Sequence, residues 1–107
     1  MMTSKIAVAL LLCAGMPWAF AQADKDLKEL LQASGCMSCH AVDEKVVGPA
    51  FKAVATKYAG QADAVDTLAQ SVRNGSRGKW GRTPMPPHAS LSADELKALV
   101  TWVLSNK

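Results

Sequence analysis

Hydrophobic residues recur at helical spacing in four segments of the chain. The segments cover residues 24–34, 51–58, 62–73 and 92–104. In the first segment, Leu27, Leu30 and Leu31 lie on one helical face. The last segment opens with Ser92 and carries Glu95 three positions later, which is the pattern of a helix-capping box. Because no segment alternates with a period of two, the sequence predicts an all-α fold.

Residues 74–90 interrupt this helical pattern. They contain three glycines and three prolines, together with Trp80 and Met85. Proline lacks a backbone N–H group, so a continuous helix through this segment is excluded, and Pro86 favours an extended backbone at Met85. The sequence therefore predicts a structured loop in which Met85 stands between Pro84 and Pro86.

Residues 1–23 have the layout of a secretory signal peptide. One positive charge at Lys5 precedes an apolar run, and small residues from Ala21 to Ala23 follow it. Pro17 interrupts the run, which is shorter than the roughly 20 residues that a membrane-spanning helix needs. We therefore expect a cleaved leader and export to the periplasm, with no membrane span in the mature protein.

Cleavage after Ala23, with cleavage after Ala21 as the alternative, leaves a single mature domain of residues 24–107. This domain has a net charge of +2 and no long basic run, so the sequence gives no support to nucleic-acid binding. A chain of this length buries only a small core, and it needs an additional stabilising element to fold.

Cysteine spacing indicates what that element is. Cys13 belongs to the leader, whereas Cys36 and Cys39 are separated by two residues and followed directly by His40. This Cys-x-x-Cys-His pattern is the attachment signal for c-type haem. The two thiols bond to the two vinyl groups of the porphyrin, and the neighbouring imidazole can bind the iron. The sequence therefore predicts one covalently attached haem c with His40 as an axial ligand.

Three other uses of the cysteine pair compete with haem. A thioredoxin-like redox pair requires a βαβ pattern, and the sequence contains no strand pattern. A zinc site needs about four ligands, and the mature chain offers only its two cysteines with His40 and His88. A structural disulfide between Cys36 and Cys39 remains as the main alternative.

The residue on the other side of the iron decides between electron transfer and chemistry at an open site. Met37 lies within the attachment turn and cannot reach across the ring, which leaves Met85 and His88. Although a methionine is ordinarily a core residue, the prolines around Met85 would hold its thioether rigidly. Thioether ligation also stabilises ferrous haem. A closed, six-coordinate iron passes electrons and performs no catalysis, so we expect an electron carrier and not an enzyme.

Two further residues are candidates for contacts with the cofactor. The carbonyl group of Pro49 can accept a hydrogen bond from His40, although a simple turn proline is the alternative. Trp80 can donate its indole N–H to a haem propionate, and plain packing is equally compatible with its position.

Across residues 24–107 the chain resembles the small bacterial class I cytochromes c of the c-551/c-552 type. The motifs that carry the resemblance are Gly35–His40, Val47–Ala50, Tyr58–Gly60, Asn74–Ser76, Trp80–Gly81, Pro84–Pro87 and Trp102–Ser105. The resemblance implies about four helices around one haem, with His40 and Met85 as axial ligands. It also supports the Pro49 carbonyl as acceptor from His40 and Trp80 as a propionate donor.

The same resemblance implies a soluble, monomeric periplasmic shuttle for single electrons. Its redox protein partners would be bc-type complexes, reductases, oxidases or peroxidases, in respiration or denitrification. Two competing functions are a haem enzyme or gas sensor that opens its iron site, and a disulfide-stapled binding module without haem.

Three features of the sequence bear on this interpretation. His88 stands where members of the family often have asparagine, and Ser71 occupies a place where relatives can carry a basic residue near a propionate. On that basis we expect a less compensated propionate. Basic residues near the predicted site either form a ring that attracts acidic partners or belong to an ordinary solvated surface. They are Lys45, Lys52, Lys57, Arg77, Lys79 and Arg82.

Overall fold

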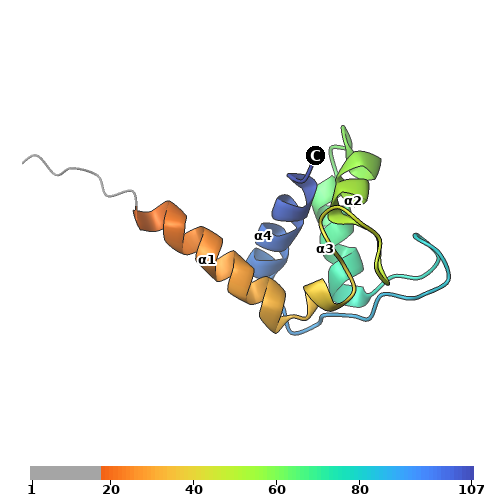
Figure 1. Cartoon of the computed structure of the whole chain (residues 1–107), viewed down its shortest axis with the longest axis horizontal. Coiled ribbons are helices and arrows are strands. Elements are labelled where there is room, and N and C mark those ends of the chain that lie inside the picture. The colour runs from red at the N-terminus through yellow and green to blue at the C-terminus, as the bar shows by residue number, and fades with distance from the viewer. Residues whose placement is uncertain (1–17) are drawn as a thin grey trace, which may run out of the picture.

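The computed structural model describes the backbone of residues 18–107 and the side chains of residues 26–107. Cys13 and most of the predicted leader lie outside the described residues. Within them the chain forms four α-helices and one 3₁₀ turn (Figure 1). The elements are α1 (Trp18–Ala33), η1 (Cys36–Ser38), α2 (Phe51–Tyr58), α3 (Ala64–Asn74) and α4 (Ala93–Leu104). The all-α prediction is confirmed.

Two helices begin at different residues from those predicted. Helix α1 already includes the first described residue, Trp18, and no glycine or proline between Trp18 and Gly35 interrupts it, whereas the predicted helix covers residues 24–34. Gly35 then ends the helix in a left-handed conformation, with φ of 70°. Helix α3 begins at Ala64, two positions later than predicted, because the backbone N–H of Ala64 donates to Gln61 O in a preceding turn.

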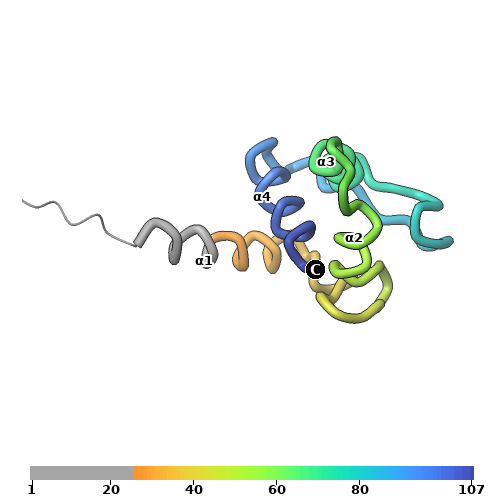
Figure 2. Tube along the Cα trace, turned by 90° about the horizontal axis from the view of Figure 1, so that it is seen from above, coloured from red at the N-terminus to blue at the C-terminus, as the bar shows by residue number. Residues whose placement is uncertain are grey.

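Helix α4 is the centre of the packing and lies against both α2 and α3 (Figures 1 and 2). The hydrophobic core has two parts, and α4 contributes to both. The first part contains Val54, Tyr58, Ala64, Leu68 and Val100. The second part contains Leu31, Leu91, Leu96 and Leu99, and it attaches the C-terminal end of α1 to α4.

The predicted capping box at the start of α4 is confirmed. Ser92 Oγ accepts a hydrogen bond from the Glu95 backbone N–H at 3.1 Å, and the Ser92 N–H donates to Glu95 Oε1 at 3.1 Å. The pair satisfies two backbone N–H groups that a helix start leaves without partners.

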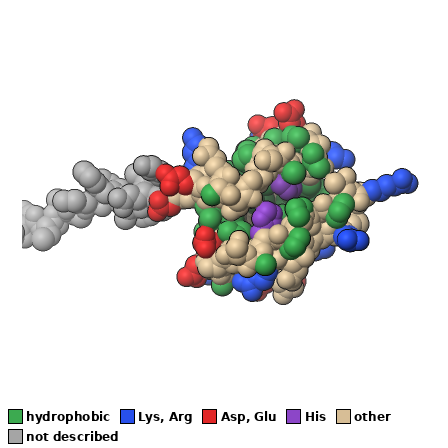
Figure 3. Space-filling view, turned by 90° about the horizontal axis from the view of Figure 1, so that it is seen from below, with side chains coloured by type: hydrophobic (Ala, Val, Ile, Leu, Met, Phe, Trp, Pro, Cys, Tyr) green, Lys and Arg blue, Asp and Glu red, His purple; other side chains and the backbone are tan. Residues whose placement is uncertain are grey.

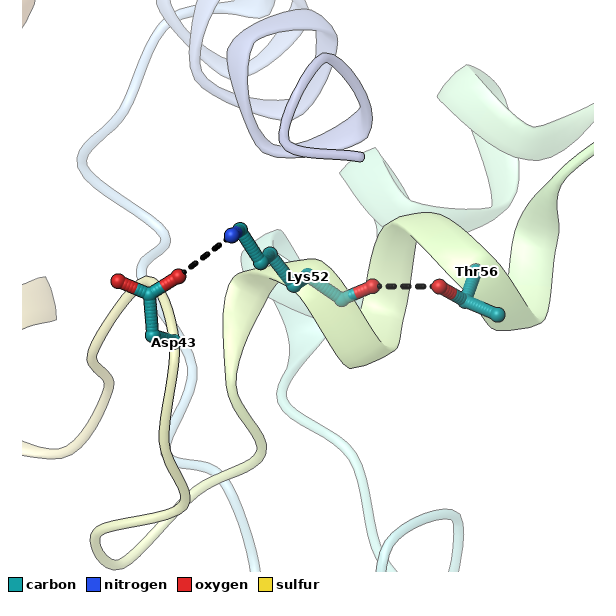
Figure 4. Close-up of polar contacts among 3 residues, drawn as sticks. All are labelled: Asp43, Lys52 and Thr56. Atoms are coloured by element: carbon teal, nitrogen blue, oxygen red, sulfur yellow. Dashed lines mark hydrogen bonds and ion pairs between the residues drawn. The ribbon is translucent and has the colours of Figure 1, made fainter.

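The segment after His40 is tied to the first turn of α2. The Phe51 N–H donates to Ala41 O at 2.9 Å, and Asp43 pairs with Lys52 at 2.7 Å (Figure 4). Thr56 Oγ1 donates to the Lys52 carbonyl one turn further along the helix, at 2.9 Å. The ion pair is exposed and contributes at most about 1 kcal/mol, so the backbone contact is the more important anchor.

Candidate functional site

A cavity of about 320 Å³ lies between the helices, and its wall contains Cys36, Cys39, His40 and Met85. All four helices contribute apolar side chains to it, among them Leu31, Val54, Leu68 and Leu99. The volume falls within the range of roughly 300 to 1,000 Å³ typical of ligand and cofactor sites. Figure 3 shows histidine side chains surrounded by hydrophobic ones on one face of the molecule.

The two cysteines are presented by a tight turn. The backbone N–H groups of Cys39 and His40 both donate to Cys36 O, at 3.3 and 3.0 Å. Both thiols are free and half-buried, so the structure does not contain the alternative disulfide. Burial raises the pKa of the Cys36 thiol. Among the described residues, no group of three or more His, Cys, Asp or Glu side chains is arranged to hold a metal ion.

The ring of His40 is held on two sides. Its Nδ1–H donates to the Pro49 carbonyl oxygen at 2.7 Å, which leaves Nε2 available as a ligand atom. Phe51 stacks on the ring, with centroids 5.0 Å apart and an interplanar angle of 18°. A Cβ atom at Gly48 would come within 2.6 Å of Cε1 of His40, so a larger residue there would have to displace the ring. These contacts fix the orientation of the imidazole.

Met85 is held mainly by its own backbone. Its N–H donates to Ser76 O at 2.9 Å, and the Ser76 N–H donates to Met85 O at 3.1 Å. This reciprocal pair closes the loop that follows α3 and turns residues 76 and 85 toward one another. Pro84 and Pro86 restrict the backbone on both sides of the half-buried Met85 side chain. The thioether therefore has a defined place in the cavity wall.

His88 also lies in this wall and is half-buried. Its backbone N–H donates to Val72 O at 2.9 Å, near the end of α3. The main chain of His88 thus helps to satisfy the carbonyl groups that a helix C-terminus leaves open.

Trp80 lies half-buried in the wall and packs against the first part of the core. The Nζ atom of Lys57 stands 4.5 Å from the centroid of the Trp80 ring, and it also donates to Lys79 O at 3.4 Å. The Nζ atom of Lys79 donates to Ser71 Oγ at 2.7 Å. These contacts join the loop to α2 and α3.

The structure thus brings together all six residues that the sequence analysis singled out. They are Cys36, Cys39, His40, Pro49, Trp80 and Met85. The sequence analysis did not assign three residues that shape the site, namely Gly48, Gly75 and Ser76. A glycine beside a proline, such as Gly48, or directly after a helix, such as Gly75, indicates that another part of the chain approaches closely. The sequence does not show which part approaches, because His40 and Met85 lie eight and ten positions away.

Cys36, Cys39, His40 and Met85 together suit one kind of cofactor. Such a cofactor would react with two thiols and would contain a metal that can accept one ligand on each side. An imidazole with Nε2 free and a thioether are suitable axial donors for haem iron, and the free thiols match the two vinyl groups. The chemistry of the donor set and the apolar lining therefore fit haem c.

Comparison with known proteins agrees with this assignment. The model of the cytochrome c family matches residues 25–107. Cytochrome c-551 of Pseudomonas aeruginosa is 54% identical over 83 residues, which cover 78% of this chain and 79% of that protein. Cytochrome c-552 of Nitrosomonas europaea is 46% identical over 101 residues, which cover 94% of this chain and 91% of that protein.

Solved structures give the same result for the fold. The crystal structure of wild-type Nitrosomonas europaea cytochrome c552 matches with a TM-score of 0.71 and 45% identity. The match covers 75% of this chain and 99% of that one. The class 1 cytochrome MtoD of Sideroxydans lithotrophicus matches with a TM-score of 0.64 and 31% identity, and this match covers 80% of this chain and 95% of that one.

Proposed function

The chain belongs to the cytochrome c family, and within it to the c-551/c-552 type, and on this premise we propose that His40 and Met85 are the two axial ligands of its iron. Proteins of this type carry covalently attached haem c and are electron carriers, not enzymes, and this chain shares that function. Bound haem c supplies a one-electron Fe(II)/Fe(III) couple.

The observation that carries the proposal is the placement of His40 and Met85 in the wall of one cavity with both cysteines. The Pro49 carbonyl accepts the Nδ1 proton of His40, and this makes Nε2 a stronger donor to the metal. The reciprocal hydrogen bonds with Ser76 hold the backbone of Met85. Both residues are thus held by contacts within the protein itself, which favours little rearrangement on gain or loss of an electron.

The surrounding side chains keep water away from the cofactor. Leu68, Leu99 and Val100 are buried and line the same cavity. An apolar environment would disfavour the additional positive charge of an oxidised centre. This supports a closed electron-transfer site over a site that binds exogenous substrates.

Substitution of each methionine near the site tests the ligand assignment. Thioether ligation gives the oxidised protein a weak near-infrared absorption band, which Met85→Ala should abolish while haem stays attached. Met37→Ala is the matched control, because Met37 belongs to the attachment turn and is 46% exposed. Survival of the band in Met85→Ala, or its loss in Met37→Ala, would contradict the assignment.

We further propose that the mature protein works in the periplasm with redox proteins such as bc-type complexes, reductases, oxidases or peroxidases. Met37, Val46 and Val47 are exposed by 46%, 51% and 51%, and Val47 also lines the cavity. Exposed apolar side chains beside a cofactor suit short-lived contacts with a protein partner. None of the helices described within residues 18–107 is long and apolar enough to cross a membrane.

Export can be tested by the mass of the protein isolated from a periplasmic fraction. Cleavage after Ala23 predicts a chain that begins at Asp24 and carries one covalent haem. Detection of residues 1–23 on the haem-loaded protein would contradict a cleaved leader.

A further inference from the structure

Among the residues that the structure describes, Lys79 is the only Lys, Arg, Asp or Glu side chain in the wall of the cavity. Haem, in contrast, carries two propionate carboxylates, and anions at the edge of a mostly apolar cavity are unfavourable without a positive partner. We propose that Lys79 is the cation that compensates a propionate and thereby raises the reduction potential of the iron.

Ser71 holds the ammonium group of Lys79 at this place. Ser71 Oγ donates its own proton to Thr67 O, 3.2 Å away and one turn back in α3. The same oxygen therefore has lone pairs free to accept, and Lys79 Nζ donates to it at 2.7 Å. Because the serine is neutral, it positions the ammonium without cancelling its charge.

A second lysine holds the backbone of Lys79. Lys57 Nζ donates to Lys79 O at 3.4 Å and stands 4.5 Å from the centroid of the Trp80 ring system. Among the side chains of residues 26–107, the one recorded ion pair joins Asp43 and Lys52. No described carboxylate therefore competes for the charge of Lys79, which is available to an anionic group of the cofactor.

The charge has a defined effect on the iron. Oxidation adds one positive charge to the centre, and an adjacent cation opposes that change. Lys79 therefore favours Fe(II) both directly and by offsetting a propionate, whose negative charge would favour Fe(III). Ser71 is neutral, so it cannot itself compensate a propionate. In this proposal Lys79, eight positions further along the chain, supplies the positive charge beside it. The inference rests on the proposed function, because it requires haem in this cavity.

Spectroscopic redox titration of the haem-loaded protein tests the proposal. The Fe(II)/Fe(III) ratio of each variant is measured in equilibrium with the same reference couple, at pH 7 and low ionic strength. Lys79→Gln should lower the ratio about three- to tenfold, the size expected when one charge is removed from a partly solvated site. Lys79→Arg keeps the charge and should stay within about twofold of the unchanged protein. Lys97→Gln removes an equal charge from an exposed position in α4 that does not line the cavity, and it should also stay within about twofold.

Two results would overturn the role of Lys79. One is a ratio in Lys79→Gln equal to that in Lys97→Gln. The other is an equal change in Lys79→Arg and Lys79→Gln, which would mean that the packing of the lysine and not its charge sets the ratio. The near-infrared band, recorded on every variant, keeps this test separate from the ligand assignment. If the band persists while the ratio is unchanged, the inference about Lys79 fails and the proposed axial ligands stand.

Discussion

Gly75 lies directly against the backbone of Met85. A Cβ atom at Gly75 would stand 2.6 Å from the Met85 carbonyl oxygen, and Gly75 has a φ of 77°, which other residues rarely adopt. The end of α3 can approach the Met85 segment this closely only because residue 75 has no side chain.

Replacement of Gly75 by alanine should therefore disturb both stability and ligation. We expect a loss of about 2 to 4 kcal/mol in the free energy of unfolding, from left-handed strain and from the backbone clash together. Gly78→Ala is the control, since Gly78 has a φ of 71° but nothing within 4 Å of its Cβ position. It should lose only about 1 to 2 kcal/mol and keep the near-infrared band. Equal losses in denaturant titrations would show that contact with Met85 is unimportant.

Gly48→Ala should act on the other axial side chain. The new methyl group would overlap the His40 ring, 2.6 Å from Cε1, and would force the imidazole away from the Pro49 carbonyl. We expect about 1 to 3 kcal/mol of destabilisation together with a changed reduction potential.

Gly60→Ala distinguishes this effect from general strain. Gly60 has a φ of 76°, with nothing within 4 Å of its Cβ position, so its replacement strains the backbone away from the site. It should lower stability and leave the potential unchanged. An unchanged potential in Gly48→Ala as well would argue against steric control of the His40 ring.

The capping box of α4 offers a test that does not involve the cofactor. Ser92→Ala removes the acceptor for the Glu95 N–H and should cost about 1 kcal/mol in chemical unfolding. Ser90→Ala, two residues earlier and exposed, should change stability by less than about 0.5 kcal/mol. If the two variants unfold at the same denaturant concentration, the cap contributes nothing measurable.

Leu96 is 2% exposed and belongs to the second part of the core, which attaches α1 to α4. Leu96→Ala should lower the free energy of unfolding by about 2 to 5 kcal/mol, because it leaves a cavity among Leu31, Leu91 and Leu99. Leu96 does not line the site, so the haem spectrum under native conditions should stay the same. A large change in the haem spectrum with an unchanged free energy of unfolding would contradict the conclusion that Leu96 stabilises the core without affecting the site.

Features that depend on neighbours in the sequence could be predicted from it. The bounds of α2 and the Ser92–Glu95 cap follow from local periodicity and side-chain chemistry, and the structure contains both. Helix α1 includes Trp18 to Ala23, which belong to the predicted leader, so the helix and the predicted mature chain do not share a first residue.

Features that depend on the path of a loop could not be predicted in the same way. The contact between Lys79 and Ser71 requires the glycine-rich loop to fold back onto α3, which no periodicity encodes. The sequence leaves open whether the basic residues form a ring or a solvated surface, and it does not indicate that Lys52 pairs with Asp43 or that Lys57 lies over Trp80. Both contacts join a residue of α2 to a residue of a loop, so local periodicity does not encode them.

The pairing of Ser76 with Met85 has a consequence for the evolution of this protein. It uses main-chain atoms alone, so any residue except proline can stand at position 76 without loss of the two hydrogen bonds. The side chains of Arg77 and Arg82 take no part in that pairing, and neither lines the cavity. Mutations at these two positions can adapt the surface to a new partner while the methionine keeps its place, so recognition and redox chemistry can diverge separately.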